Sequence, residues 1–428
     1  MPKRPATASN HPPVRIGHSS PSCHSWSAPE ILDAARWTAL TLGIHAAILL
    51  APLLGVGLYG QFGAAGLHDV RIYFDYASRA LRGAVPYRAY PVEYPPLAVL
   101  LFVIPRLATG RFETYAFLFA AEMWLFDGLA VYLVARYTAA REGVRAVPVR
   151  LAWYTASFAA LYPVVGNRYD LAPAAVALAG ALAWLAGRPV PGGLLASAGT
   201  LMKIFPAVAV APAAVSELAA ARVTRVRGLR TFGAATVVCG AVWYALDGAR
   251  AVTYHVERGL QIETAWAGAL MLADKILGIV PAWRYSHSSV ELVAPGAGVL
   301  AVFAIPAQIA LAGGVIWRFA RSGRGDPLRY AAATVLALIV PGKVLSPQYL
   351  VWLVPFVPVL GGPAGRAARP LFVIACVATT FEYLATRHLA SFELWAVLVL
   401  NCRNALLVAV LAVLLGRGRA GKSEPAGG

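Results

Sequence analysis

The sequence predicts an all-α integral membrane protein. Hydrophobic residues make up 59% of the 428-residue chain and charged residues only 13%, whereas about 25% of an ordinary soluble domain is charged. The mean hydropathy is +0.64, and the apolar residues are grouped in runs of the kind that cross a bilayer as helices. Composition and grouping together exclude a soluble globular protein.

The net charge of +17 comes from basic residues in short loops between the apolar runs. A nucleic-acid-binding protein gathers its basic residues on one face, so we expect no nucleic acid partner. Lys and Arg in short loops are instead typical of the cytoplasmic side of membrane proteins. The four cysteines are scattered and form no CxxC pair, so no disulfide framework is indicated.

The apolar runs predict a bundle of about twelve transmembrane helices. Several runs are shorter than the ~20 residues of a straight span, which suits helices that line a polar cavity. The run 95–109 is bounded by prolines and is predicted to be re-entrant or interfacial. The other runs are 37–59, 113–136, 151–166, 170–187, 192–204, 206–220, 231–246, 297–318, 328–341, 348–361, 370–387 and 393–415.

The Lys/Arg bias places both ends of the chain in the cytoplasm. Residues 1–36 are rich in Pro, Ser and His and are predicted to be disordered. The transmembrane domain covers 37–415, and 416–428 forms a basic tail. Six polar segments then fall on the outer side, which predicts that they form one site. They are Asp69, Glu93, the NRYD turn at 167–170, the MKIFP break at 202–206, the loop 247–296 and PGKVLSPQYL at 341–350.

The stretch 67–97 is the longest polar segment in the first half of the chain. Its first part predicts an amphipathic helix on the membrane surface, because apolar residues recur every three or four positions. The sequence from Gly83 to Pro96 is rich in Pro and Tyr and predicts a loop. An acid such as Asp69, at the mouth of this loop in a chain mostly buried in lipid, is a functional candidate.

The motifs also carry a family resemblance. The chain contains, in order, HDVRIYFDYASRALRGAVPY, EYPPL, NRYD, KIFP, YHVERGLQIE and KVLSPQYLVWLVP. With this order and spacing it resembles glycosyltransferase family 87, which has the C-type fold and includes actinobacterial mannosyltransferases of the cell envelope. The resemblance extends from about residue 37 to 415, nearly the whole chain.

The resemblance implies a hexosyltransferase at the plasma membrane with its active site on the extracytoplasmic face. The donor would be a polyprenyl-phosphate sugar, with mannose as the expected hexose, and the acceptor a hydroxyl of a glycolipid, a lipoglycan or a protein. Inner loops are too short to form a domain for a nucleotide sugar. Membrane lipids are expected partners. No cofactor is expected, although a single divalent ion at Asp69 is an alternative.

Asp69 is the predicted catalytic residue, because a carboxylate must take the proton of the attacking hydroxyl. The alternative is a helix N-cap. Lys203, Arg258 and Lys343 are predicted to bind the donor phosphate, since cations near a leaving phosphate stabilise its charge. The alternative for both lysines is a side chain that extends to the membrane interface. Asp75 is predicted to be a solvated or structural acid.

The predicted sugar- and acceptor-binding residues are Glu93, Tyr94, Asn167, Asp170, His255, Glu263 and Gln348. Three of them have a structural alternative: Tyr94 packs its loop, Asp170 caps a helix, and His255 is an ordinary interfacial side chain. Near mid-membrane, Glu122, Asp127 and Arg403 predict an internal ion-pair or hydrogen-bond cluster, with a proton relay as the functional alternative.

A different class of function stays open at this stage. The broken segments MKIFP and PGKVLSP lie in different halves of the chain, and transporters use such pairs of broken helices at their binding sites. A multi-pass transporter or lipid flippase is therefore the alternative to the glycosyltransferase. Its residues would line a path open to both sides of the membrane. An inactive family member with a structural role is a third interpretation, which an intact Asp69 disfavours.

Overall fold

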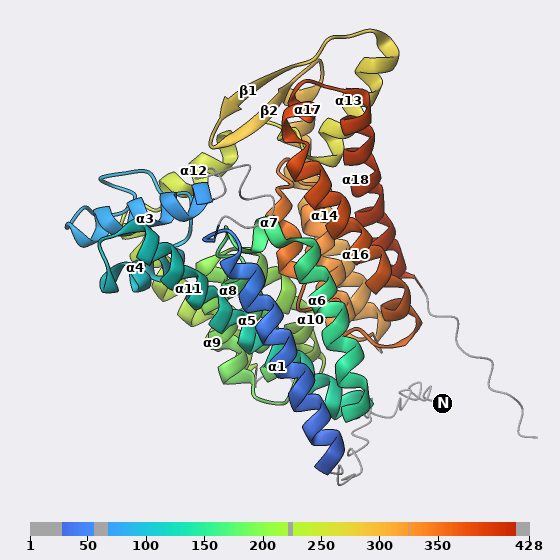
Figure 1. Ribbon diagram of the computed structural model, residues 1–428. Helices are drawn as coiled ribbons and strands as arrows, with labels where there is room; N and C mark the ends of the chain where they lie inside the picture. Colours follow the sequence, from blue (N-terminus) through green and yellow to red (C-terminus); the bar gives the residue numbers. More distant parts are fainter. Residues whose placement is uncertain (1–27, 55–66, 221–225, 324, 417–428) are drawn as a thin grey trace, which may run out of the picture.

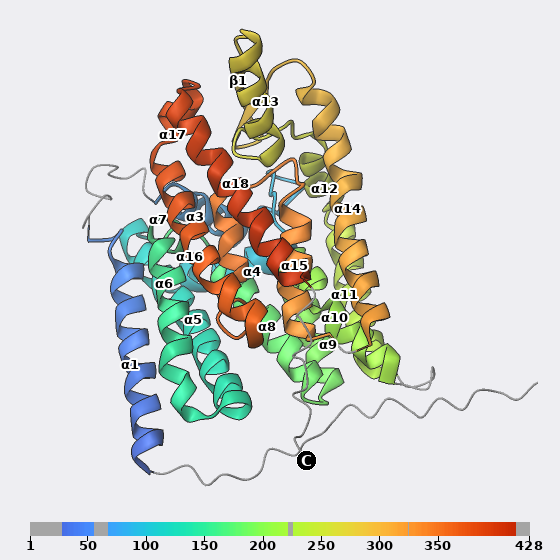
Figure 2. The ribbon, with the colours of Figure 1, turned by 90° about the vertical axis from the view of Figure 1, so that its right-hand side faces the viewer.

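The computed structural model describes residues 28–54, 67–220, 226–323 and 325–416. In these ranges the chain forms a bundle of α-helices with a small antiparallel hairpin at one end (Figures 1 and 2). The elements are α1 (Ala28–Leu50), α3 (His68–Leu81), α4 (Pro96–Ala108), α5 (Phe112–Glu142), η2 (Val144–Ala146), α6 (Val147–Ala160), α7 (Tyr162–Val165), α8 (Leu171–Leu185), α9 (Pro189–Met202), α10 (Phe205–Ala220), α11 (Arg227–Ala245), α12 (Ala249–Glu257), α13 (Ala265–Leu277), β1 (Ala282–Ser286), β2 (Ser289–Val293), α14 (Ala297–Ser322), α15 (Pro327–Ile339), η3 (Pro347–Leu353), α16 (Gly362–Leu384), α17 (Thr386–Ala390) and α18 (Leu394–Leu415).

The predicted class, a helical membrane bundle, is confirmed, but the count of about twelve spans is not. Helices α5, α14, α16 and α18 are long and apolar enough to cross a membrane, and the pair α11–α12, bent by 86°, would add a fifth span. Helices such as α8 and α15 have only 15 and 13 residues, most of them buried. The apolar side chains of these helices therefore pack inside the bundle. Hydropathy alone does not distinguish such buried helices from helices that contact lipid.

Three predicted segments differ from the structure. The run 348–361 is not a membrane helix: it forms the short 3₁₀ helix η3 and then turns, all inside the core, because its prolines lack the backbone N–H that a helix needs. The loop 247–296 contains α12, α13 and the hairpin. Helix α1 begins at Ala28, within the segment predicted to be disordered, while residues 1–27, 55–59 and 417–428 lie outside the described residues.

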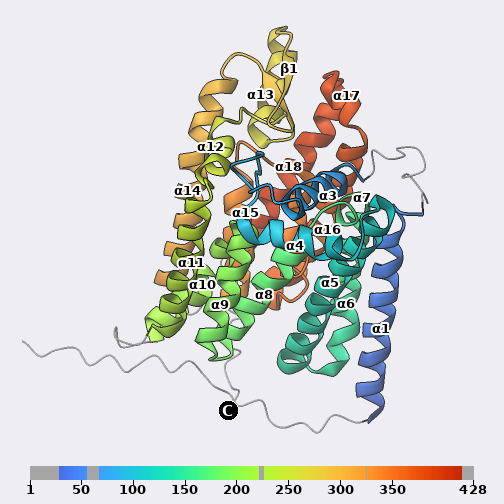
Figure 3. The ribbon, with the colours of Figure 1, turned by 90° about the vertical axis from the view of Figure 1, so that its left-hand side faces the viewer.

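The predicted surface helix is α3. Its apolar face, with Val70, Tyr73 and Ala77, is buried, and Asp75 on the other face is exposed. Tyr73 stacks on Phe102 of α4, with 4.1 Å between the ring centroids. Figures 1 and 3 show α3 and α4 near the end of the bundle that carries α12 and the hairpin. The apolar spacing in the sequence thus identified the buried face of this helix.

The Pro/Tyr loop after α3 is held by hydroxyls of its own tyrosines. The Tyr87 hydroxyl donates to the carbonyl oxygen of Tyr94 (2.8 Å), and the Tyr90 hydroxyl donates to that of Tyr76 on α3 (3.0 Å). The loop leads into α4, which has 13 residues and spans about 20 Å at 1.5 Å per residue, less than the bilayer core. The structure therefore has a short helix where the sequence predicted a re-entrant or interfacial segment.

The predicted mid-membrane cluster is wrong in its membership. Asp127 lies 2.7 Å from His45 Nδ1 and accepts a hydrogen bond of 2.7 Å from the Tyr154 hydroxyl. Arg403 instead pairs with Glu382 of α16 at 3.3 Å. The sequence indicates that these charges lie at a similar depth in the membrane, but not which helices face each other. It therefore predicts one buried cluster where the structure has two.

The contact between α9 and α11 depends on glycine. A Cβ added to Gly193 on α9 would lie 2.3 Å from the carbonyl oxygen of Gly228 on α11. A side chain there would push the helices apart, because packed backbones leave no room for it. Gly233, also on α11, has no neighbour within 4 Å of its added Cβ.

We expect Gly193→Ala to lower the free energy of unfolding by about 1–3 kcal/mol through overpacking. Gly233→Ala is the matched control and should be neutral or slightly stabilising, because alanine favours the helix. Thermal unfolding of the purified variants in detergent measures the difference. Equal stability of the two variants would contradict close α9–α11 packing.

Candidate functional site

Asp69 lies in the first turn of α3 and is 8% exposed. Its carboxylate forms an ion pair with Arg168 through Oδ1, and the amide of Asn167 donates to Oδ2 at a long 3.4 Å. The N-cap position is occupied by Leu67, so the carboxylate is engaged by the NRYD turn rather than in capping. One oxygen is fixed by a cation, while the other is only weakly engaged.

Burial raises the pKa of the Asp69 carboxyl above its usual value, and the nearby carboxylates of Glu93 and Asp170 raise it further. The Arg168 guanidinium acts in the opposite direction and lowers this pKa. Because removal from water is the largest of these effects, the group is a stronger proton acceptor than a solvated aspartate.

The NRYD turn joins α7 to α8 and connects two parts of the site. Asp170, two residues after Arg168, accepts hydrogen bonds from Lys203 Nζ (2.5 Å) and from the Trp352 indole (2.5 Å). Asp170 occupies the N-cap position of α8 but makes no side-chain capping hydrogen bond. Its acid is therefore used in an ion pair, and the capping alternative does not describe it.

Lys203 lies at the break between α9 and α10, surrounded by aromatic rings. Its Nζ is 4.8 Å from the ring centroid of Tyr169, 5.3 Å from that of Trp352 and 5.9 Å from that of Tyr349. The side chain is only 14% exposed, so it does not extend to the interface. A carboxylate together with ring faces compensates the buried ammonium group.

Helix α12 brings His255 over the Pro/Tyr loop. The 86° bend after α11 directs α12 towards that loop, and His255 Nε2 lies 2.9 Å from the backbone carbonyl oxygen of Glu93. Tyr254, adjacent in sequence, is influenced electrostatically by the Glu93 carboxylate. The loop acid and the α12 histidine, which are 162 residues apart, are thus neighbours.

The three predicted phosphate-binding cations have different partners. Lys343 Nζ donates to the carbonyl oxygens of Val256 and Arg258, both at 2.7 Å, and so holds carbonyls that are free at the end of α12. Lys203 is paired with Asp170. Within the described part of the chain, Arg258 has no carboxylate within salt-bridge distance, and its Nε is buried without a hydrogen-bond partner.

Glu263 belongs to a buried acid cluster behind the site. Its carboxylate accepts a hydrogen bond from the Gln261 side-chain amide, and its backbone carbonyl accepts one from Arg403 Nη2 at 2.9 Å. Burial raises the pKa of Glu263, and the nearby Glu382 carboxylate raises it further. The Arg403 guanidinium acts in the opposite direction and lowers the pKa of this carboxyl, with smaller contributions from Arg168 and Arg258.

The remaining two predicted residues lie at the edge of this group. Tyr94 is buried in a ring cluster, 5.3 Å from the centroid of Tyr169, as the packing alternative proposed. Gln348, at the start of η3, accepts a hydrogen bond of 2.7 Å from the Ser346 hydroxyl. Among the described residues, no group of three or more His, Cys, Asp or Glu side chains is placed to hold a metal ion.

Three residues of this constellation, Arg168, Trp352 and Glu382, were not among the predicted site residues, and Tyr349 was predicted only as part of the segment 341–350. Arg168 lies in the NRYD motif, two residues before the candidate acid Asp170. Its positive charge at this position could have identified it as a site residue. Tyr349 and Trp352 stack at 4.2 Å and come from a run that hydropathy assigned to the membrane. Their place beside Lys203 depends on η3, which the sequence did not predict.

Comparison with known proteins gives one family. The model of glycosyltransferase family 87 matches residues 93–347, more than half of the chain. A solved structure of ArnT from Cupriavidus metallidurans bound to undecaprenyl phosphate aligns with a TM-score of 0.48 at 16% identity, over 90% of this chain and 78% of that chain. No curated protein matches the sequence.

We expect Lys203→Met to be strongly destabilising, because it leaves Asp170 buried without its cation. Loss of one partner of a buried pair costs about 3–5 kcal/mol. Arg258→Gln should cost much less, since this arginine has no acid partner among the described residues. Thermal unfolding in detergent compares the two, and Lys203→Met combined with Asp170→Asn should recover part of the loss. Equal losses for Lys203→Met and Arg258→Gln would contradict the assignment of the pair.

Proposed function

We propose, because the chain belongs to glycosyltransferase family 87, that it transfers a hexose from a polyprenyl-phosphate donor to a hydroxyl of a lipid or glycan acceptor. The proposed hexose is mannose, and the proposed location of the site is the extracytoplasmic face of the plasma membrane. The observation that carries the proposal is the buried Asp69 carboxylate, fixed through one oxygen by Arg168 of the NRYD turn. The same turn carries Asp170, which pairs with Lys203.

In this proposal Asp69 is the general base. The acceptor hydroxyl donates to Oδ2 of Asp69, which has only the long contact to Asn167. As the acceptor oxygen forms a bond to the anomeric carbon, that carbon loses its bond to the phosphate oxygen, and the electron pair leaves with the polyprenyl phosphate. The hydroxyl proton passes to Asp69. Attack opposite the leaving group inverts the configuration at the anomeric carbon.

We assign the leaving phosphate first to Arg258. Its planar guanidinium suits phosphate oxygens, and it is not occupied by an acid of the described chain. Lys203 can contribute charge but shares it with Asp170. Lys343 acts indirectly, because its ammonium group holds the Arg258 carbonyl and so positions the end of α12. Charge placed in advance at the leaving group stabilises the transition state without reorganisation.

The sugar is proposed to lie between the Pro/Tyr loop and α12. Glu93 and His255 adjoin there, and Asn167 reaches Asp69 from the opposite side. The Glu263 carboxylate accepts a hydrogen bond from the Gln261 side-chain amide, and we assign to it a role in orienting the sugar. Binding both substrates in line would lower the barrier through orientation.

The transporter alternative is less well supported by the same geometry. The two broken segments, around Lys203 and Lys343, both reach the polar constellation near Asp69. A transporter would need such breaks to line a path through the bundle. These segments converge with the buried acid of α3 and with Arg258 at the end of α12, which has no acid partner among the described residues. This convergence favours a reaction site.

We expect Asp69→Asn to reduce transfer by about 10²–10⁴-fold, the usual contribution of a general base. Asparagine keeps the size of aspartate but cannot accept the proton. Membranes carrying either form would receive radiolabelled polyprenyl-phosphate mannose and total lipid extract, and labelled product would be counted.

Asp75→Asn is the matched control for this experiment. Asp75 lies on the same helix but on its exposed face, so this variant should transfer sugar at the wild-type rate. Equal activity of Asp69→Asn and wild type would remove Asp69 as the base. Absence of transfer by the folded wild type, with every lipid-linked sugar offered, would favour the transporter.

The pH dependence follows from the raised pKa of Asp69. Transfer needs the ionised carboxylate, so kcat/KM should fall as the pH drops through this pKa, at a higher pH than the value of about 3.9 for a solvated aspartate. Arg168→Gln removes the cation that lowers this pKa and should move the acid limb to still higher pH. The acid limb of kcat/KM against pH tests this expectation, and a limb that moves to lower pH would contradict it.

A further inference from the structure

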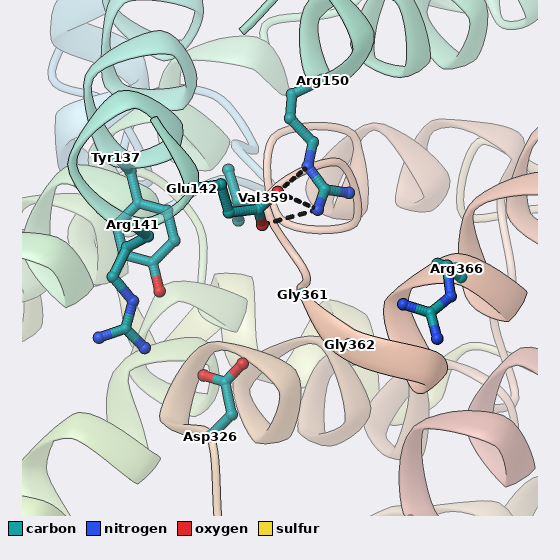
Figure 4. Close-up of a pocket in the computed structure, with 9 residues that line it drawn as sticks. All are labelled: Tyr137, Arg141, Glu142, Arg150, Asp326, Val359, Gly361, Gly362 and Arg366. Carbon is teal, nitrogen blue, oxygen red and sulfur yellow. Dashed lines mark hydrogen bonds and ion pairs between the residues drawn. The ribbon is translucent and has the colours of Figure 1, made fainter. Parts of the chain in front are cut away.

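A polar pocket lies at the opposite end of the bundle from Asp69. Helix α3 contacts the beginning of α5, where Arg71 lies 3.7 Å from the ring centroid of Phe112, whereas the pocket is at the end of this 31-residue helix. Its volume is about 360 Å³, within the range of small-molecule sites. It is lined by Tyr137, Arg141, Glu142, Arg150, Asp326, Val359, Gly361, Gly362 and Arg366 (Figure 4).

The pocket lies at the level where two membrane spans end. Helix α5 ends at Glu142 and α16 begins at Gly362, and both helices are long and apolar enough to cross the bilayer. Residues at the ends of spanning helices lie at the depth of the lipid headgroups. The Lys/Arg bias of the sequence predicts that this boundary is the cytoplasmic one.

Arg150 is a buried arginine whose guanidinium is only partly hydrogen-bonded by the described residues. The residue is 7% exposed, and its Nε and Nη2 donate to the carboxylate of Glu142, with the shortest contacts at 2.6 Å. Its Nη1 is buried and has no hydrogen-bond partner among the described residues. In Figure 4 this third nitrogen points away from Glu142, towards the side of the pocket on which Arg366 lies.

Other donors face the same space. Arg366 and Arg141 are exposed side chains that line the pocket. In the first turn of α16, Pro363 has no N–H and the N–H of Gly365 donates to the carbonyl oxygen of Gly361 at 3.2 Å. The N–H groups of Gly362 and Ala364 remain, and N–H groups at a helix start favour anions. Two carboxylates are also present, but both are engaged: Glu142 by Arg150 and Asp326 by the backbone N–H of Leu328 at 3.0 Å.

We propose that this pocket binds a phosphate group, as carried by the headgroup of an anionic phospholipid. Three arginines and a helix start supply forked and backbone donors, which match phosphate oxygens. The unpartnered Nη1 of Arg150 is a buried donor that such an oxygen would satisfy. The depth of the pocket at the membrane boundary favours a lipid headgroup over a soluble anion, and basic pockets between transmembrane helices are known sites for such headgroups.

The proposal is tested by native mass spectrometry of the purified protein, titrated with phosphatidylglycerol or with phosphatidylcholine. The wild type should retain phosphatidylglycerol selectively. Arg366→Gln removes one exposed cation of the pocket and should weaken that binding about fivefold. Arg321→Gln is the matched control, an exposed arginine in the last turn of α14 outside the pocket, and should bind as the wild type does.

A parallel titration with inorganic phosphate at constant ionic strength separates the two sources of phosphate. Competition between inorganic phosphate and phosphatidylglycerol, lost in Arg366→Gln, supports the proposal. Inorganic phosphate that binds while phosphatidylglycerol does not would overturn the lipid as its source. Equal weakening in Arg366→Gln and Arg321→Gln, or no selectivity for phosphatidylglycerol in the wild type, would overturn the site itself.

Discussion

The need to pair buried charge governs the arrangement of the candidate active site. The turn at 167–170 meets this need twice: Arg168 pairs with Asp69 on the surface helix, and Asp170 pairs with Lys203 at the α9–α10 break. One short turn thereby fixes three helix ends relative to one another. Buried ion pairs contribute little net stability because desolvation offsets their attraction, so their value here is the geometry they impose on α3, α8 and α10.

A consequence of this pairing is that the cations of the site are not equivalent. Lys203 is held by an acid and Lys343 by two backbone carbonyls, while Arg258 has no acid partner in the described part of the chain. Position along the sequence suggested one role for all three. Their partners therefore distinguish two lysines engaged by the protein from an arginine without an acid partner among the described residues.

The arginines at the two ends of the bundle differ in how completely the protein hydrogen-bonds them. Near Asp69, Arg168 compensates an acid whose pKa burial raises. At the other end, Arg150 donates to Glu142 through two nitrogens, and the third has no hydrogen-bond partner in the described part of the chain. A basic membrane boundary is predictable from loop composition, but a specific pocket within it requires the ends of α5 and α16 to meet.

The sequence by itself determined the membrane class, the buried face of α3, the family and the convergence of Asp69, Glu93, Asn167, Asp170, Lys203 and His255. The membrane class and the buried face of α3 follow from the hydrophobic pattern, and the common side of the polar segments follows from the Lys/Arg bias. The family follows from the resemblance of the ordered motifs. Tertiary structure alone decided that Asp127 pairs with His45 while Arg403 pairs with Glu382, that 348–361 is a buried 3₁₀ turn, and that Arg168 faces Asp69. Hydropathy measures the preference of a side chain for apolar surroundings over water. Which side chain it then contacts depends on which helices face each other in the folded bundle.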